Sequence, residues 1–181
     1  MLRQIKRGII KHLIGYDNPK KYWNYRWKLT KATENIQYWS HLFSKVQRLM
    51  NIYKCKSILD IGCGPAKLKT LKGYIGLDFS IESLKRSKLK SFILADITNK
   101  IPLPDNSIDM IFIRNVLIHI KPEELPKAIQ EIIRISKTCI VIAETPSKST
   151  QDHCFRHNYH SLFKDYEGEL IFLDSEGNIR N

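Results

Sequence analysis

Two short blocks of the chain place glycines and carboxylates at the ends of predicted strands. Residues 57–66 read as a buried strand that breaks into the turn Gly62-x-Gly64. Residues 74–78 read as another buried strand, and this one ends on the carboxylate of Asp78. Glycines let the backbone approach a ligand closely, and an acid at the tip of the next strand can accept both hydroxyls of a ribose. The two blocks together predict a site for an adenosine-type ligand at the carboxyl edge of a parallel sheet.

The glycine turn lacks the features of two common phosphate-binding loops. A dinucleotide fingerprint needs a third glycine in Gly-x-Gly-x-x-Gly, and Lys67 stands at that position. The chain also has no Gly-Lys-Ser/Thr run of the P-loop kind. The turn therefore has no clear role in binding phosphate. The prediction of an adenosine-type ligand depends more on the acidic strand end, Asp78.

Apolar segments of strand length alternate along the chain with helical or loop stretches. Strands are expected at about 57–62, 74–78, 91–95, 108–114 and 138–143. A helix is expected from Pro122 to about Lys137, because proline suits a first turn and acids follow it. Such alternation predicts an α/β fold with a doubly wound, Rossmann-like, mostly parallel sheet. Tyr74 comes only ten positions after Gly64, so the first helix must be short.

Both ends of the chain add elements to this core. Residues 1–50 are expected to form a basic, helical N-terminal extension, with one or two helices over 20–50. Residues 51–181 are expected to form the catalytic domain, in one compact domain overall. A short helix is expected after about Ser161. Residues 169–174 and 177–181 then predict a closing β-hairpin.

Four motifs in chain order resemble the class I S-adenosylmethionine-dependent methyltransferases, over Ser57 to about Glu144. Within that family the chain looks most like the small-molecule, ubiquinone-methyltransferase-like group. The resemblance implies S-adenosylmethionine as cofactor, with Asp78 on the ribose and Asp96 on the adenine amino group. The block 108–119 looks like the fourth strand and the segment after it. Cofactor-binding residues implied by these motifs are Asp60, Gly62, Gly64, Asp78, Phe79, Asp96, Ile97 and Arg114.

An aromatic segment before the core, residues 22–26, resembles a Tyr-Trp-x-x-Arg segment of related enzymes. The cofactor carries a carboxylate, which a guanidinium matches well, so Arg26 is expected to bind it. Trp23 is then expected to form an apolar lid. The alternative is that these aromatic side chains only pack a helix onto the sheet.

The densest polar cluster, residues 153–160, follows the last predicted parallel strand and holds three histidines. Such a strand ends on the ligand side of the sheet, so His157 is expected to act as a base beside Tyr159. His119, after the fourth strand, is expected to face the acceptor or to end a helical turn. The run 157–163 resembles a His-Asp-Tyr-x-x-Leu-Phe segment of some glycan- and lipid-pathway methyltransferases, with Asn158 in place of the acid.

Two other readings of this cluster stay open. It could be a polar surface loop with Tyr159 packed beneath it. A zinc site from His153, Cys154 and His157 is also conceivable. The four cysteines lack CxxC spacing, however, so free thiols in a reducing cytoplasm and no metal are expected.

Positive charge is concentrated at the beginning of the chain. The net charge is +12, and residues 1–31 carry nine Lys or Arg against Asp17 alone. This arm suits an anionic membrane surface, an anionic substrate or RNA; the alternative is a solvated helix face. No apolar run of about 18 residues predicts a membrane-spanning helix. A cytoplasmic protein is expected, with peripheral contact at the inner membrane face as an option.

The combined prediction is a methyltransferase that acts on a small or lipid- or glycan-linked acceptor, at oxygen. An RNA methyltransferase is the alternative that the charge favours, since Lys and Arg contacts dominate nucleic-acid affinity. The absence of an Asn-Pro-Pro-Tyr-like segment after the fourth strand and of an added RNA-binding module argues against it. A non-catalytic cofactor-fold protein that assists a partner is the third option.

Overall fold

The computed structural model describes residues 18–29, 36–144, 154–174 and 177–180. The strands of these residues form one seven-stranded sheet in the order β3-β2-β1-β4-β5-β6-β7. Neighbours are parallel from β3 to β6, and β6 and β7 form an antiparallel hairpin. The strands are β1 (Ile58–Ile61), β2 (Tyr74–Asp78), β3 (Phe92–Leu94), β4 (Ile108–Ile113), β5 (Ser136–Ile142), β6 (Glu169–Leu173) and β7 (Ile179–Arg180). The mostly parallel α/β sheet and the C-terminal hairpin are therefore confirmed.

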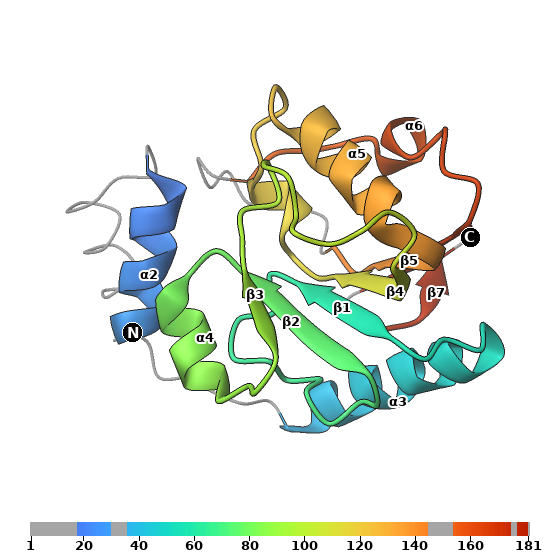
Figure 1. Cartoon of the computed structure of the whole chain (residues 1–181), viewed down its shortest axis with the longest axis horizontal. Helices are drawn as coiled ribbons and strands as arrows, with labels where there is room; N and C mark the ends of the chain where they lie inside the picture. The colour runs from blue at the N-terminus through green and yellow to red at the C-terminus, as the bar shows by residue number, and fades with distance from the viewer. Residues whose placement is uncertain (1–17, 30–35, 145–153, 175–176, 181) are drawn as a thin grey trace.

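The described helices flank this sheet. They are α2 (Pro19–Leu29), α3 (Ile36–Ile52), α4 (Ile81–Ser87), the 3₁₀ helix η1 (Leu117–His119), α5 (Leu125–Ile135) and α6 (Tyr159–Leu162). Helix α3 covers one face of the sheet and α5 the other, while α2 lies beside α4 at one end (Figure 1).

Side chains along each central strand alternate between the two faces, as strand geometry requires. In β4, Ile111 and Ile113 belong to the core under α5, whereas Met110 and Phe112 belong to the core under α3. All four are at most 1% exposed. Burial on both faces explains why the strands of this sheet read as nearly continuous apolar runs.

Two predicted helices differ from the structure. No regular helix forms between β1 and β2, where the described residues make only turns. Gly62, Gly64 and Ala66 take left-handed φ angles there, and such residues interrupt a right-handed helix. Helix α5 begins at Leu125 rather than at Pro122, because a turn closed on the carbonyl of Lys121 precedes it.

Strand register brings the ends of five strands to one edge of the sheet. Ile61 pairs with Leu77 and with Ile113, so Gly62, Asp78 and Arg114 follow at one level. Asp78 pairs with Leu94, and the Ala95 N–H donates to the Asp78 carbonyl at 3.2 Å. On the other side Ile113 pairs with Ile142, two residues before Glu144. The predicted acids and glycines therefore share the carboxyl edge of the sheet.

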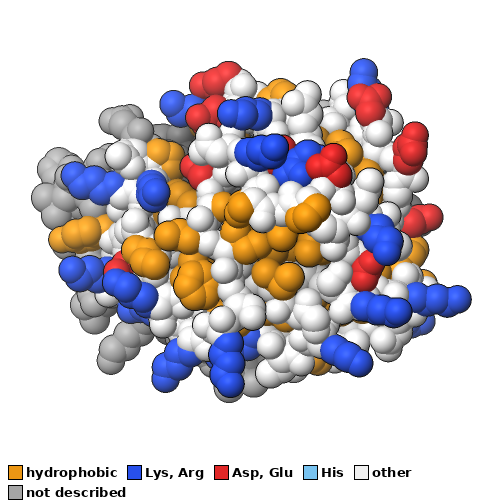
Figure 2. Space-filling view, in the orientation of Figure 1, with side chains coloured by type: hydrophobic (Ala, Val, Ile, Leu, Met, Phe, Trp, Pro, Cys, Tyr) orange, Lys and Arg blue, Asp and Glu red, His pale blue; other side chains and the backbone are white. Residues whose placement is uncertain are grey.

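The face seen in Figure 2 has apolar side chains in its middle, with lysines and arginines around them. Strand β3, which crosses this view, exposes Phe92 by 44% and Leu94 by 50%. None of the described helices is both long and apolar enough to cross a membrane.

Candidate active site

The glycine turn after β1 is closely packed against two other segments. Gly62 and Gly64 have φ angles of +66° and +52°, which other residues rarely adopt. A Cβ atom on Gly62 would collide with Val116, which follows β4. A Cβ atom on Gly64 would come within 3.0 Å of the Trp27 ring of α2. Glycine is therefore required here both for backbone conformation and for space.

Asp78 joins this turn to the end of β2. The side chain is 5% exposed. Its Oδ2 accepts a hydrogen bond from the Gly64 N–H at 2.9 Å, and its Oδ1 accepts one from the Ser80 N–H at 2.8 Å. Burial raises the pKa of Asp78, although these two N–H groups oppose the shift. The Phe79 N–H and the Ser83 hydroxyl also lower the pKa of Asp78, so the hydroxyls of a ribose would share this carboxylate with donors of the chain.

Asp60 lies within β1, below the edge of the sheet. Its Oδ2 accepts a hydrogen bond from the Tyr74 hydroxyl at 2.6 Å. Burial raises the pKa of Asp60 to about 7; the Tyr74 hydrogen bond and the Arg114 charge lower it, and the Asp78 charge raises it. The hydrogen bond of Asp60 is thus made to the neighbouring strand β2, and its predicted contact with the cofactor stays a prediction.

Asp96, two residues beyond β3, forms a local turn. Its Oδ1 accepts from the Thr98 N–H at 3.0 Å and from the Thr98 hydroxyl at 2.8 Å. Ile97 is 6% exposed and belongs to the apolar core, so only its backbone could face a ligand. Phe79 is half-buried directly after Asp78. The contact of Asp96 with adenine remains a prediction.

Helix α2 lies against this edge of the sheet and carries the predicted Trp23 and Arg26. The Arg26 guanidinium stacks on the Trp23 ring, 4.5 Å from its centroid. The Trp23 ring also meets the His119 ring edge-on, with centroids 5.1 Å apart. On the same helix, Asn24 Oδ1 accepts a hydrogen bond from the Ser80 hydroxyl at 2.7 Å. Trp23 and Arg26 therefore lie between the glycine turn and the segment after β4.

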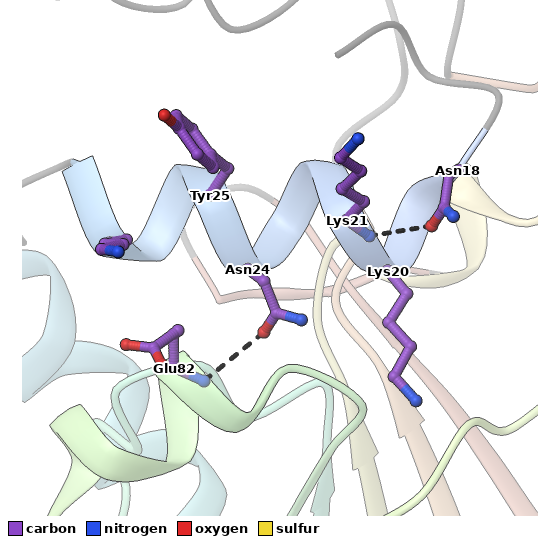
Figure 3. Close-up of a pocket in the computed structure, with 7 residues that line it drawn as sticks. Asn18, Lys20, Lys21, Asn24, Tyr25 and Glu82 are labelled. Atoms are coloured by element: carbon purple, nitrogen blue, oxygen red, sulfur yellow. Dashed lines mark hydrogen bonds between the residues drawn. The ribbon is translucent and has the colours of Figure 1, made fainter.

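A shallow pocket of about 380 Å³ lies on the outer side of α2, against the start of α4 (Figure 3). Its lining includes the lysines Lys20, Lys21 and Lys28 with Glu82 as the acid. Asn24 points toward Glu82 and accepts its N–H at 3.5 Å. The pocket adds positive charge beside the site but contains none of the predicted catalytic residues.

The predicted acceptor residues meet around η1. The coil before α6 runs alongside η1, where the Phe155 N–H donates to the Ile118 carbonyl at 2.8 Å. Nε2 of His157 lies 3.1 Å from the Leu117 carbonyl, which only accepts, so this nitrogen is the donor. Burial lowers the pKa of His157, although the carbonyls of Leu117 and Ile120 oppose the shift. His119 ends η1, with its Nδ1 3.7 Å from Cys154 Sγ.

Glu144, two residues beyond β5, is the acid that the sequence interpretation left out. The side chain is 7% exposed. Its Oε1 accepts from the N–H groups of Val116 at 2.9 Å and Leu117 at 3.0 Å. Its Oε2 is buried without a hydrogen-bond partner, and so is the hydroxyl of Tyr159. Burial raises the pKa of Glu144 to about 7, against the pull of these N–H groups and of Arg114.

Tyr159 completes this part of the site. Its ring lies between His157 and Phe172, with centroid distances of 5.9 Å and 6.5 Å. Burial raises the pKa of Tyr159, and the negative charge of Glu144 raises it further. His157 and Tyr159 thus lie near Glu144, and His119 ends η1, the helix on which Glu144 and His157 form their hydrogen bonds; the roles of the three predicted residues stay predictions. Arg114 instead stacks on Trp39 of α3, 4.6 Å from the ring centroid.

No cluster of three or more His, Cys, Asp or Glu side chains able to hold a metal occurs among the described residues. His153 of the zinc alternative lies outside them.

Comparison with known proteins agrees with this geometry. Residues 59–139 match the family model of a methyltransferase domain. The chain is 33% identical over 144 residues to an uncharacterised protein of Methanocaldococcus jannaschii, covering 75% of this chain and 60% of that protein. It is 27% identical over 103 residues to the phosphoethanolamine N-methyltransferase of Triticum aestivum, covering 50% of this chain and 20% of that enzyme. The chain thus spans less than two thirds of the length of either relative.

A solved structure extends the likeness to most of the fold. The magnesium protoporphyrin IX methyltransferase (ChlM) from Synechocystis PCC 6803, with bound S-adenosylmethionine, superposes with a TM-score of 0.53 at 15% identity. This superposition covers 88% of the present chain and 85% of that enzyme.

The domain match over residues 59–139 identifies a methyltransferase domain, and the fold is that of the class I S-adenosylmethionine-dependent methyltransferases. S-adenosylmethionine is the cofactor of that class. The residues at this edge of the sheet have the chemistry that such a cofactor requires. A glycine turn without Cβ atoms lies beside the buried hydrogen-bond acceptor Asp78. Neither the domain match nor the fold distinguishes the ubiquinone-methyltransferase-like group from other groups.

Proposed function

We propose that the protein transfers the methyl group of S-adenosylmethionine to an oxygen of a small or a lipid- or glycan-linked acceptor. The observation that carries this proposal is the arrangement of two sets of side chains around one segment, residues 114–119. The glycine turn, which Asp78 holds, packs on Val116 of this segment, and His157, next to Tyr159, hydrogen-bonds to Leu117.

The cofactor half would use the residues at the ends of β1, β2 and β3. Asp78 would accept the ribose hydroxyls and Asp96 the adenine amino group, while Arg26 would bind the carboxylate under the Trp23 ring. When bound, the cofactor supplies an activated methyl group. What the chain must then provide is alignment of the acceptor with that methyl group.

The acceptor half would be lined by His119, His157 and Tyr159. Burial lowers the pKa of His157, which keeps the imidazole neutral and able to take a proton at neutral pH. Because Nε2 donates to the Leu117 carbonyl, Nδ1 is the nitrogen that would receive the proton of the acceptor hydroxyl.

Positive charge next to the site supports an acceptor with an anionic part, such as a lipid or glycan phosphate. Lys20, Lys21 and Lys28 lie along α2, and the basic residues of 1–17 precede it in the chain. We expect such a protein to work in the cytoplasm and to touch the anionic inner membrane face through this arm. The same charge is what favours RNA as the competing acceptor.

Methyl-labelled S-adenosylmethionine tests the proposal directly. The full chain is incubated with a sugar and lipid extract in one assay and with total RNA in another. We expect label in the extract and none in RNA, and the reverse result would replace the proposal by an RNA methyltransferase.

His157 is then tested in the extract assay. His157→Ala should lower turnover by roughly 10²–10⁴-fold, with S-adenosylhomocysteine affinity nearly unchanged. His160→Ala is the matched control, because this exposed histidine packs on Phe172 instead. A normal rate for His157→Ala would leave alignment alone as the mechanism.

A further inference from the structure

Two polar atoms near the acceptor half are buried and have no hydrogen-bond partner. They are Oε2 of Glu144 and the hydroxyl of Tyr159, and they are the buried side-chain polar atoms without a partner among the described residues. Buried polar groups are nearly always paired, because leaving one unpaired costs the hydration that it lost. The two side chains share neighbours, since Glu144 accepts from the Leu117 N–H, the Leu117 carbonyl accepts from His157, and the Tyr159 ring packs on His157. One ligand group between them would satisfy both atoms.

We propose that Glu144 and Tyr159 bind a hydroxyl group of the methyl acceptor, which donates to Glu144 Oε2 and accepts from the Tyr159 hydroxyl. This inference rests on the proposed function and names the acceptor chemistry: a neutral polyhydroxylated molecule of the sugar kind at this point of the site. A hydroxyl is both donor and acceptor, so one group satisfies both atoms.

Other ligand chemistries fit these two atoms less well. A phosphate or a carboxylate offers only acceptor atoms, and the charge of an ionised Glu144 would repel it. A hydroxyl also tolerates either protonation state of Glu144, since it can donate to the carboxylate or accept from the acid. This matters because burial raises the pKa of Glu144 to about 7, so both states are present at neutral pH.

Glu144 is held in place by contacts that leave Oε2 available. Its Oε1 accepts from the N–H groups of Val116 and Leu117, which fixes the carboxyl plane against η1. The pair is closed to solvent, so an acceptor must displace a covering segment to reach it. The coil 154–158 adjoins η1 through hydrogen bonds from Phe155 and His157 to backbone carbonyls and through the Cys154–His119 contact. Local opening of a coil costs less than global unfolding.

The substitution Glu144→Gln tests the pair with little change of shape. Glutamine keeps an oxygen for the N–H groups of Val116 and Leu117 but places an NH₂ donor where Oε2 stood. Tyr159→Phe removes the hydroxyl and keeps the ring packing. Asp109→Asn is the matched control, because Asp109 likewise accepts from two backbone N–H groups, at 2.8 and 3.1 Å, but near the amino ends of β4 and β1.

Ligand-observed NMR on the full chain at pH 8 measures binding of methyl α-D-glucopyranoside and of methyl phosphate, with and without S-adenosylhomocysteine. We expect the glucoside to bind the wild type and to bind Glu144→Gln and Tyr159→Phe roughly tenfold more weakly, as for a lost bond to a charged or phenolic group. Asp109→Asn should bind like the wild type, and any binding of methyl phosphate, which the lysines of α2 could attract, should not weaken in Glu144→Gln or Tyr159→Phe.

Equal glucoside binding by the wild type and Glu144→Gln would mean that the pair holds only internal water, and would overturn the inference. No glucoside binding by the wild type, or methyl phosphate binding that is lost in both Glu144→Gln and Tyr159→Phe, would also overturn it. The proposed function has a separate readout, because calorimetry of S-adenosylhomocysteine on the same samples tests the cofactor half. Loss of that binding in the wild type would refute the proposed function, whatever the glucoside does.

Discussion

The most quantitative prediction concerns Asp60, a carboxyl buried inside the sheet. Its pKa rises from the ordinary 3.8 to about 7, chiefly because burial disfavours the charged form. A shift of this size corresponds to roughly 4 kcal/mol, which we take as an upper bound. The substitution Asp60→Asn removes the charge and keeps an oxygen to accept from the Tyr74 hydroxyl. The variant should therefore unfold less readily than the wild type at pH 8.

The sign of the effect follows from proton binding. Folded Asp60 holds its proton more tightly than unfolded Asp60, so its contribution to stability is complete below about pH 4. That contribution is lost as the pH rises through about 7. Asp60→Asn has no such proton, so the difference between variant and wild type should open between pH 4 and pH 8. Urea unfolding of both proteins across this range measures it.

Asp109 supplies a control of opposite sign. The pKa of Asp109 lies below its ordinary value. Burial alone would raise it, but hydrogen bonds from Lys56 and Ser57 and the charge of Lys137 lower it. Asp109→Asn should therefore cost more stability at pH 8 than at pH 3. If Asp60→Asn is less stable than the wild type at pH 8, or if its advantage does not shrink toward pH 4, the reasoning about Asp60 is wrong.

Two further predictions concern the cofactor site and the basic arm. Asp78→Ala should weaken S-adenosylhomocysteine binding several-fold or more, since bonds to a charged group contribute roughly 1.5–3 kcal/mol each. Asp96→Asn should weaken it less than Asp96→Ala, and calorimetry that finds full affinity for Asp78→Ala would remove the ribose assignment. Deleting residues 1–14 should leave that affinity within a few-fold but reduce binding to anionic vesicles or RNA, most at low salt, because screening acts over about 10 Å at 0.1 M. If the full chain binds neither at low salt, the arm is only a solvated face.

The strands and their acidic ends were predictable because both signals are local. Each buried strand is a short apolar run; Asp78 ends β2, and Asp96 lies two residues beyond β3. The same rule applied to the strand predicted at 138–143 would have found Glu144, which follows it directly. The hairpin was predictable for a similar reason, since a glycine in the sequence marks its turn. In the structure this residue, Gly177, has a φ of +84°.

The contacts of α2 could not be predicted from the chain alone. Nothing in the local pattern indicates that Trp27 packs on Gly64 or that Asn24 accepts from Ser80, because these contacts join residues far apart in sequence. The missing first helix has a similar origin. Ala66 adopts a φ of +53° although alanine strongly favours right-handed helix, so tertiary packing overrides propensity there.

Residues 116–119 connect the two halves of the site through contacts of different kinds. The Val116 side chain packs over Gly62, while its backbone N–H donates to Glu144. The Leu117 N–H also donates to Glu144, and its carbonyl accepts from His157. A shift of this segment would therefore change the glycine turn and the acceptor residues together. Methyl transfer depends on alignment, and displacements of about 1 Å can cost roughly 10²-fold in rate. In the proposed reaction, the buried Glu144 would therefore act through its position, because it holds two N–H groups of this segment, as well as through its free oxygen.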